Sequence, residues 1–206
     1  MAKKEAPLNT LSDYMPEGSF SLVFEYIKKY HVHLTITKNR KSVLGDYRHA
    51  LGSKNHRISV NGGLNKYSFL ITLIHELAHL VTFIEFRNEV QPHGRQWKQI
   101  YGTMMKSFLG TKIFPADIEL VLAHSLHDLP ASSCSDDRLT RVLNKYDVRK
   151  PGSVMVEELT EGDLFSIDNN KVFKKGKQLR KRIQCLEVSS GKLFLFSPVY
   201  EVKRLQ

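Results

Sequence analysis

The sequence predicts an α+β protein with a mixed N-terminal part and an all-β C-terminal part. Three observations predict this class. Residues 67–86 are apolar at helical spacing, three short runs before them alternate with β-branched residues, and beyond Lys150-Pro151-Gly152 the apolar period changes from helical to two. We therefore expect two domains, over residues 1–149 and 150–206.

The first domain opens with a helix, three strands and a second helix. Residues 20–30 carry apolar side chains on one helical stripe, behind a Pro-Glu-Gly turn. The runs HLTIT (33–37), SVLGDYR (42–48) and HRISVN (56–61) predict a small antiparallel sheet. The apolar residues of 67–86 wrap most of the way round their helix, which is typical of a central, buried helix.

Three more helices are expected after this central one. The first runs from Gly94 to about Leu109, and the others cover residues 116–126 and 136–146, the last with Ser135 as its N-cap. Residues 134–146, which include this last helix, lie between the two proposed domains, where they act as a lid or, as we favour, as a packing connector.

Short β runs fill the C-terminal part of the chain. In order they are VMVEEL, DLFSID, KVFKKG, LRKRIQCLEV, KLFLFS and VYEVKRL. Turn signals such as Glu-Gly-Asp, Asn-Asn and Ser-Ser-Gly separate them. Short strands joined by tight turns predict a small β-barrel-like domain.

Composition indicates an ordinary globular protein of 206 residues, with 41% hydrophobic and 25% charged residues. No stretch approaches the roughly 18 uninterrupted apolar residues of a membrane span, and the N-terminal lysines are followed by no apolar run. We expect a cytoplasmic protein with no membrane partner. The two cysteines lie far apart, which excludes a disulfide framework and a cysteine-based zinc ribbon.

The chain is strongly basic. Its 31 Lys and Arg exceed its 21 Asp and Glu, giving a net charge of +10. Such a surplus favours acidic partners, nucleic acid first among them, although simple solubility explains the same charge.

The sequence HELAH, residues 75–79, places two histidines four residues apart within the central helix. At 3.6 residues per turn both imidazoles point to the same side, about one turn apart, as two ligands of one tetrahedral zinc would. Glu76 then projects toward the open coordination position, where it can act as general base. By itself this short motif also occurs by chance, and many helical histidines are only partly buried polar side chains.

Two features favour a metal site over chance. Two imidazoles and a carboxylate are costly to bury unless something pairs them. A third candidate ligand, His93, follows His79 by fourteen residues at the start of the next helix. Catalytic zinc sites usually take three protein ligands and leave the fourth position for water, so His93 completes the set.

The string HELAH…PHGRQWK resembles the SprT-like zinc metalloproteases, the family of the eukaryotic Spartan protease. The likeness covers roughly residues 15–125. It implies a zincin-like endopeptidase domain in which His75, His79 and His93 bind Zn2+ and Glu76 is the catalytic base. It also implies protein substrates bound or crosslinked to DNA, a role in the repair of DNA–protein crosslinks, and nucleic acid as activator. Trp97 matches the family's aromatic residue, and we expect it to pack behind the His93 loop.

The chain also departs from this family. Many SprT-like proteins carry a Cys-rich zinc ribbon after the protease domain, and this chain has a Cys-poor β segment instead. DNA contact therefore needs another surface. The candidate is a run of six basic residues in nine: Lys174, Lys175, Lys177, Arg180, Lys181 and Arg182.

On a β hairpin, this basic run could follow a phosphate backbone, with single-stranded DNA favoured. Four nearby aromatic residues would offer stacking surfaces: Phe165, Phe173, Phe194 and Phe196. A solvated hairpin face explains the same charges, and core positions of period two explain the phenylalanines.

Two details of the expected mechanism stay open at this level. The donor to the transition-state oxyanion is Tyr67, Tyr101, His124 or a group that the sequence does not reveal. Residues 56–61, directly before the central helix, form either the exposed strand edge that binds an extended peptide or an interior strand.

Two alternative functions compete with a DNA-directed protease. In one, the zinc is structural and the chain is a non-enzymatic binding module; Glu76 argues against this, because a structural site needs no such carboxylate. In the other, the protease acts without DNA and its basic segment meets an acidic protein.

Overall fold

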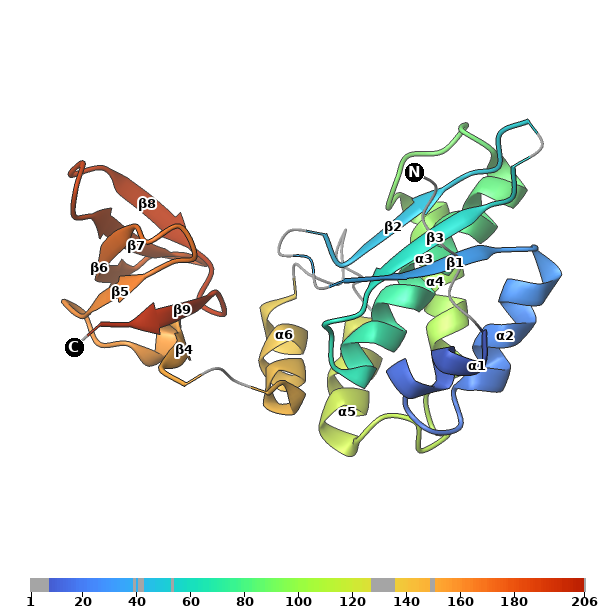
Figure 1. Ribbon diagram of the computed structural model, residues 1–206, viewed down its shortest axis with the longest axis horizontal. Coiled ribbons are helices and arrows are strands. Elements are labelled where there is room, and N and C mark those ends of the chain that lie inside the picture. The colour runs from blue at the N-terminus through green and yellow to red at the C-terminus, as the bar shows by residue number, and fades with distance from the viewer. Residues whose placement is uncertain are drawn as a thin grey trace. The chain divides into compact units, whose positions relative to one another are not determined.

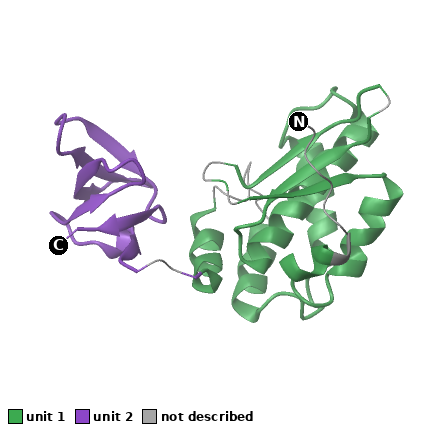
Figure 2. Ribbon diagram, viewed as in Figure 1, with its two compact units in different colours: residues 1–147 green, residues 148–206 purple. Residues whose placement is uncertain are grey.

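A computed structural model describes residues 8–38, 40, 43–52, 54–126, 136–148 and 151–205. The chain divides into two compact units, Met1–Asp147 and Val148–Gln206 (Figures 1 and 2). This division falls two residues before the predicted boundary. Mixed α+β structure in the first unit and a separate antiparallel sheet in the second agree with the predicted class.

The first unit contains six α-helices and three strands among its described residues. In chain order these are α1 (Leu8–Leu11), α2 (Phe20–Lys29), β1 (His33–Thr37), β2 (Gly45–Arg48), β3 (Arg57–Asn61), α3 (Lys66–Phe86), α4 (Arg95–Lys106), α5 (Ala116–Ser125) and α6 (Asp137–Leu143), with 3-10 turns η1 (Ser12–Tyr14) and η3 (Asn144–Tyr146).

The sheet of this unit is mixed, so the prediction of an antiparallel sheet was wrong. Its strand order is β1-β3-β2, with β1 parallel and β2 antiparallel to β3. β1 and β2 are not neighbours, because β3 lies between them. Only β2 and β3 therefore form a hairpin. The strand at 57–61 is therefore central and not the exposed edge, and its residues 58–61 are buried. The edges are β1 and β2.

Helix α3 is the centre of this unit and packs against β2 and β3 (Figure 1). It is long and apolar enough to cross a membrane by composition alone, but 72% of its most apolar window is buried inside the protein, as in core helices. The Asn65 side chain caps its N-terminus by accepting from the backbone N–H groups of Tyr67 and Ser68.

The helices after α3 complete the core. Trp97, Met105 and Phe108 are buried on the α4 side, and Ile118 and Leu122 on α5. The predicted N-cap of the last helix lies at residue 135, outside the described residues. The carboxylate of Asp136 makes the capping bonds instead, accepting from the N–H groups of residues 138 and 139.

The second unit is a six-stranded antiparallel sheet with its own apolar core. Its elements are β4 (Ser153–Met155), η4 (Val156–Glu158), β5 (Leu164–Ser166), β6 (Val172–Gln178), β7 (Ile183–Glu187), β8 (Leu193–Phe196) and β9 (Glu201–Arg204). The order β4-β9-β5-β6-β7-β8 leaves β4 and β8 at its two edges. Phe165 and Phe173 lie in the core of this unit. Closure into a barrel stays a prediction.

The Asn65 cap generates a stability prediction. Its Nδ2 donates to the Leu143 carbonyl at 3.1 Å and to Asp147 Oδ1 at 2.7 Å, so one side chain ties the start of α3 to the end of α6 and to the residue after η3. Asn65→Ala should lower the free energy of unfolding by about 1–2 kcal/mol in urea denaturation, because it removes the cap and both ties. Asp147→Ala, which removes only one tie, should cost less; an equal cost would contradict the role of the cap.

Candidate metal centre

Helix α3 presents two histidines to one place. His75 and His79 are four residues apart, and their Nε2 atoms lie 3.2 Å from each other. His75 is only 8% exposed. The four-residue spacing therefore places both imidazoles on the same side of the helix, as the sequence predicted.

His93 reaches the same point from the turn before α4. Its backbone is left-handed, with φ of 58°, which is uncommon for a residue other than glycine. The next residue, Gly94, is the N-cap of α4, and a Cβ there would lie 2.9 Å from the Gln91 carbonyl oxygen. The Pro-His-Gly sequence thus makes a tight turn that aims one imidazole at α3.

The three imidazoles converge on one point through their Nε2 atoms. His93 Nε2 lies 2.9 Å from His79 Nε2 and 3.1 Å from His75 Nε2. The three nitrogens cannot all pair with one another by hydrogen bonds. In a neutral imidazole each ring nitrogen either carries a hydrogen and donates, or carries a lone pair and accepts, so at least one of the three close pairs joins two donors or two acceptors. A tetrahedral metal with nitrogens at about 2.0–2.1 Å sets them about 3.3 Å apart, close to the observed triangle. The triad is positioned to bind a metal ion.

Burial keeps these ligands in the metal-binding form. It lowers the pKa of His75 to about 3 and that of His79 to about 4, and the neighbouring histidines add to both shifts. Burial also lowers the pKa of His93. All three rings are therefore neutral at pH 7, with a lone pair free for a cation.

Trp97 forms the floor beneath the triad. Its ring centroid lies 4.7 Å from those of His75 and His93 and 5.2 Å from that of His79, and it stacks on Tyr101 at 5.0 Å. Trp97 is 1% exposed. This contact with all three rings is more extensive than the predicted packing against the His93 loop, and it fixes their orientations together.

The carboxylate of Glu76 faces the sheet edge. It is buried, and the backbone N–H of Tyr47 on β2 donates to it. A Cβ at Gly45 would lie 2.4 Å from Glu76 Oε1 and 2.8 Å from Thr72 Cγ2, so only glycine leaves room at this point of β2. Sequence reasoning missed both β2 contacts, although a glycine inside a strand run is a signal of close approach.

Electrostatics around Glu76 favour a proton on its carboxylate. Burial raises the pKa of Glu76 to about 8, and Asp46 adds to the rise, while Arg40 and the Tyr47 N–H oppose it. A cation held by the histidines would also oppose it. Glu76 thus has the surroundings of a proton acceptor whose affinity is tuned near neutral pH.

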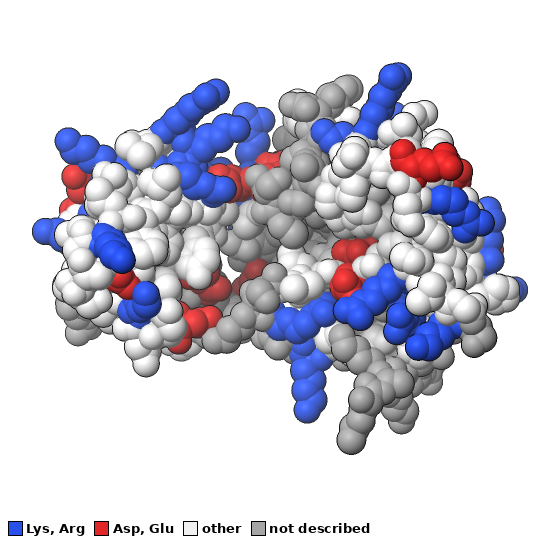
Figure 3. Space-filling model, turned by 90° about the horizontal axis from the view of Figure 1, so that it is seen from above, with Lys and Arg blue, Asp and Glu red and all other residues white. Residues whose placement is uncertain are grey.

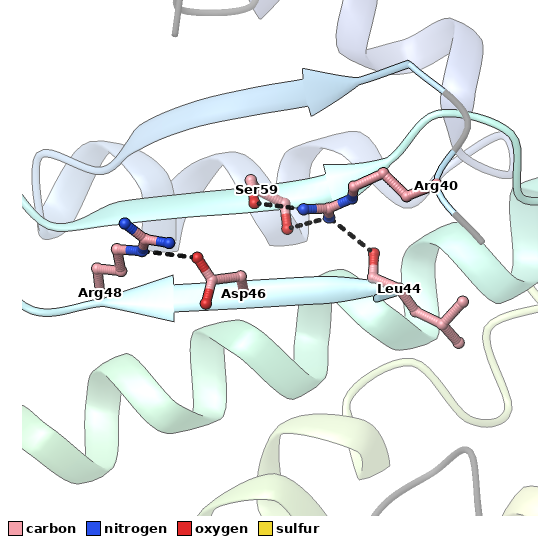
Figure 4. A network of polar contacts seen from close by, with 5 residues as sticks. All are labelled: Arg40, Leu44, Asp46, Arg48 and Ser59. Atoms are coloured by element: carbon pink, nitrogen blue, oxygen red, sulfur yellow. Dashed lines mark hydrogen bonds and ion pairs between the residues drawn. The ribbon is translucent and has the colours of Figure 1, made fainter. Parts of the chain in front are cut away.

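Arg40 links the central strand β3 to the residue before β2 (Figure 4). Its guanidinium donates to Ser59 Oγ at 3.4 Å and to the Leu44 carbonyl at 3.5 Å. Asp46 pairs with Arg48 at 2.8 Å in the same view. The Arg40 contacts tie the start of β2, next to Gly45, to β3.

Of the three oxyanion donors considered, the structure brings one near the triad. The Tyr101 ring lies 6.0 Å from that of His75, behind Trp97. Tyr67 packs instead against Phe114 and Tyr146, and His124 is exposed on α5. The oxyanion donor is still unassigned.

The predicted basic run lies on β6 and on the turn between β6 and β7. Its exposed members are Lys174, Lys177, Arg180, Lys181 and Arg182. Lys and Arg side chains project prominently from the protein surface in Figure 3. Lys175 differs, because it lies opposite the buried Cys185 and its Nζ donates to the Leu159 and Glu157 carbonyls. Its ammonium group is therefore engaged by main-chain carbonyls of the same unit, and its part in phosphate binding stays a prediction.

The aromatic residues beside this run serve mainly as core. Phe165 and Phe173 are 0% and 1% exposed and stack on each other at 5.6 Å. Phe196 packs edge-on against both. Phe194, which is 38% exposed, is the remaining candidate of the four for contact with a base.

The crowding at Gly45 generates a prediction. Gly45→Ala should lower the free energy of unfolding by about 1–3 kcal/mol, because the added methyl group overlaps Glu76 and Thr72. In a Glu76→Ala background the same change should cost clearly less, since the nearest overlapping atom is gone. Chemical denaturation of the four proteins measures this coupling. Equal costs in both backgrounds would show that Glu76 does not touch β2.

Comparison with known proteins agrees with this geometry. The SprT-like family model matches residues 17–119, half of the chain, and includes all three histidines and Glu76. Neither a search of curated proteins nor a search of solved structures gave a match. On the family match, the chain belongs to the SprT-like family.

Proposed function

We propose that the chain is a zinc-dependent endopeptidase with a zincin-like first domain, acting on proteins bound or crosslinked to DNA. Family membership supports a metalloprotease-type function in general. The observation that carries the finer proposal is the convergence of three imidazole Nε2 atoms within 3.2 Å, two of them on the helix that also carries the buried carboxylate of Glu76.

Zinc is the ion that these donors fit best. Three neutral imidazoles are borderline-soft nitrogen ligands, which suit zinc better than magnesium or calcium. Within the described ranges, the cluster contains the three histidines and no fourth His, Cys, Asp or Glu donor. Three ligands leave a position for water or substrate, which favours a catalytic site over the structural zinc of a binding module. When bound, zinc would polarise the scissile carbonyl and acidify the attacking water.

The proton transfers fall to Glu76. Its carboxylate accepts a proton from the attacking water and passes it to the leaving amine nitrogen. The contacts with Gly45 and the Tyr47 N–H hold it in one orientation for this task. Its burial excludes bulk water, which strengthens every charge interaction in the site.

The edge strand β2 is the proposed track for an extended substrate. We choose β2 for this track and not β3, because β3 is central in the sheet and has no free edge. β2 pairs with β3 on one side, and its Gly45 and Tyr47 touch Glu76. A peptide added along its other side would gain main-chain hydrogen bonds and pass the proposed proton acceptor.

The basic hairpin of β6 and β7 is the proposed nucleic-acid contact. Five of its basic side chains are exposed, and the whole chain carries a charge of +10. Single-stranded DNA is the favoured ligand, because an exposed aromatic residue, Phe194, lies in the same sheet. An acidic protein partner is the alternative, and it predicts equal activation by any polyanion.

One prediction of the proposed function separates metal binding from proton transfer. Glu76→Gln should keep zinc at the wild-type stoichiometry and lose at least about 100-fold in the rate of protein cleavage, because it cannot accept a proton. His93→Ala should lose zinc on dialysis, since one of three ligands is gone. Metal analysis and cleavage assays on both variants provide the test. Normal cleavage by Glu76→Gln would refute the proposed base, and full zinc occupancy in His93→Ala would remove this ligand.

A second prediction concerns DNA. Changing Lys174, Arg180, Lys181 and Arg182 to Gln should flatten the salt dependence of single-stranded DNA binding by up to about 3 in the log–log slope. Changing four exposed lysines of the first unit, Lys28, Lys29, Lys66 and Lys106, provides a control of equal charge. Equal slopes in the two variants would place the DNA surface elsewhere. Equal cleavage with heparin and with DNA would favour the acidic-partner alternative.

A further inference from the structure

A hollow of about 280 Å³ lies beside the N-terminal half of α3. Three sides of it come from different segments of the first unit. Ser68, Ile71 and Thr72 line it from α3. Leu44 and Leu64 come from the loops next to the sheet, and the remaining wall is formed by residues of α6 and the segment after it: Leu139, Thr140, Leu143, Asn144 and Asp147.

Thr72 links the hollow to the surroundings of Glu76. Thr72, one of its lining residues, lies one helical turn before Glu76 on α3, so both side chains project to the same side. A Cβ built on Gly45 would lie 2.8 Å from Thr72 Cγ2 and 2.4 Å from Glu76 Oε1, so these two side chains crowd the same point. The wall of the hollow therefore continues directly into the surroundings of the proposed proton acceptor.

The strand track leads to the same hollow. Leu44 immediately precedes β2, and in Figure 4 its side chain points away from the Arg40 contacts. A peptide extended along β2 places successive side chains on opposite faces. One of the residues flanking the cleaved bond would then point toward α3, where the hollow lies.

The lining selects for an apolar side chain. Five of its members are Leu or Ile, and its polar members are largely engaged with the protein itself. Thr72 Oγ1 donates to the Ser68 carbonyl, Thr140 Oγ1 to the Asp136 carbonyl, and Asp147 accepts from Asn65. The carboxylate of Asp147 would repel an acidic side chain. The volume is at the lower end for ligand pockets, which suits one large side chain.

We propose that this hollow is the specificity pocket of the enzyme, and that it holds a large apolar side chain of the substrate next to the cleaved bond. The inference rests on the proposed peptidase function. The wall from α6 lies beyond residues 17–119, which match the family, so this selectivity belongs to the chain's own additional segment. It also gives residues 136–146 a role beyond that of a connector.

The test maps cleavage sites in a peptide library derived from a digested proteome, using mass spectrometry and the zinc-loaded full chain. Wild type should favour Leu, Met or Phe over Ala at one position flanking the cleaved bond by about 10-fold or more. Thr140→Phe fills the hollow and should shift that position to small residues. Thr140→Val, similar in volume, and Arg138→Phe, exposed on the same helix, should keep the wild-type profile. An unselective wild type, or an unchanged profile in Thr140→Phe, would overturn the pocket while leaving the peptidase intact.

A binding measurement keeps the pocket testable if no peptide is cleaved. N-acetyl-leucine amide and N-acetyl-phenylalanine amide are titrated into Glu76→Gln, and the methyl NMR signals of Ile71, Leu139 and Leu143 are followed. These signals should shift with both amides, and much less with N-acetyl-glutamate amide or in Thr140→Phe. Binding without any cleavage would contradict the proposed function but support the pocket. Absence of shifts would overturn the pocket.

Discussion

The burial of polar groups inside the most apolar helix of the protein is the constraint on which the rest of the structure depends. Helix α3 forms the centre of the first core, and it also carries His75 and Glu76, which are 8% and 7% exposed. Buried imidazole and carboxylate groups are costly unless other groups compensate them. Two features around α3 supply this compensation. The three imidazoles share one point that can hold a cation, and the edge strand β2 contacts the carboxylate of Glu76.

Each supporting element follows from this requirement. The left-handed backbone of His93 and the narrow turn at Gly94 bring the third imidazole to the other two. Trp97 contacts all three rings and holds them as one body. On β2, Gly45 and the Tyr47 N–H contact the carboxylate of Glu76 and fix it. Preorganisation of this kind is what a catalytic site needs, because groups already in place need no rearrangement during the reaction.

Local patterns in the sequence predicted the parts that depend on local geometry. The spacing of His75 and His79 is a property of one helix, and the third ligand needs only a short turn, so the triad could be predicted with its residues. Strand β1 and helix α3 were expected within one residue of their observed bounds. The order of the sheet could not be predicted in the same way, because it depends on which strand lies between the others. The wrong antiparallel sheet and the open choice between edge and interior for residues 56–61 both come from that.

Contacts between distant segments account for the other differences. Gly45 is required by a side chain 31 positions further along the chain, and no residue near it in sequence reveals which side chain approaches. Lys175 belongs to a basic run, yet the alternation of β6 turns it toward the carbonyls of residues 157 and 159. Phe165 and Phe173 fit both stacking and core positions by their period, and the second core decides between the two.

The central claim is that three histidines hold one zinc ion and leave a coordination position open. X-ray absorption spectroscopy at the zinc edge, on the full chain with one metal per molecule, tests it most directly. The account predicts three imidazole nitrogens at about 2.0–2.1 Å and one further light-atom ligand from solvent. A sulfur ligand at about 2.3 Å, or a fourth imidazole that closes the site, would contradict it.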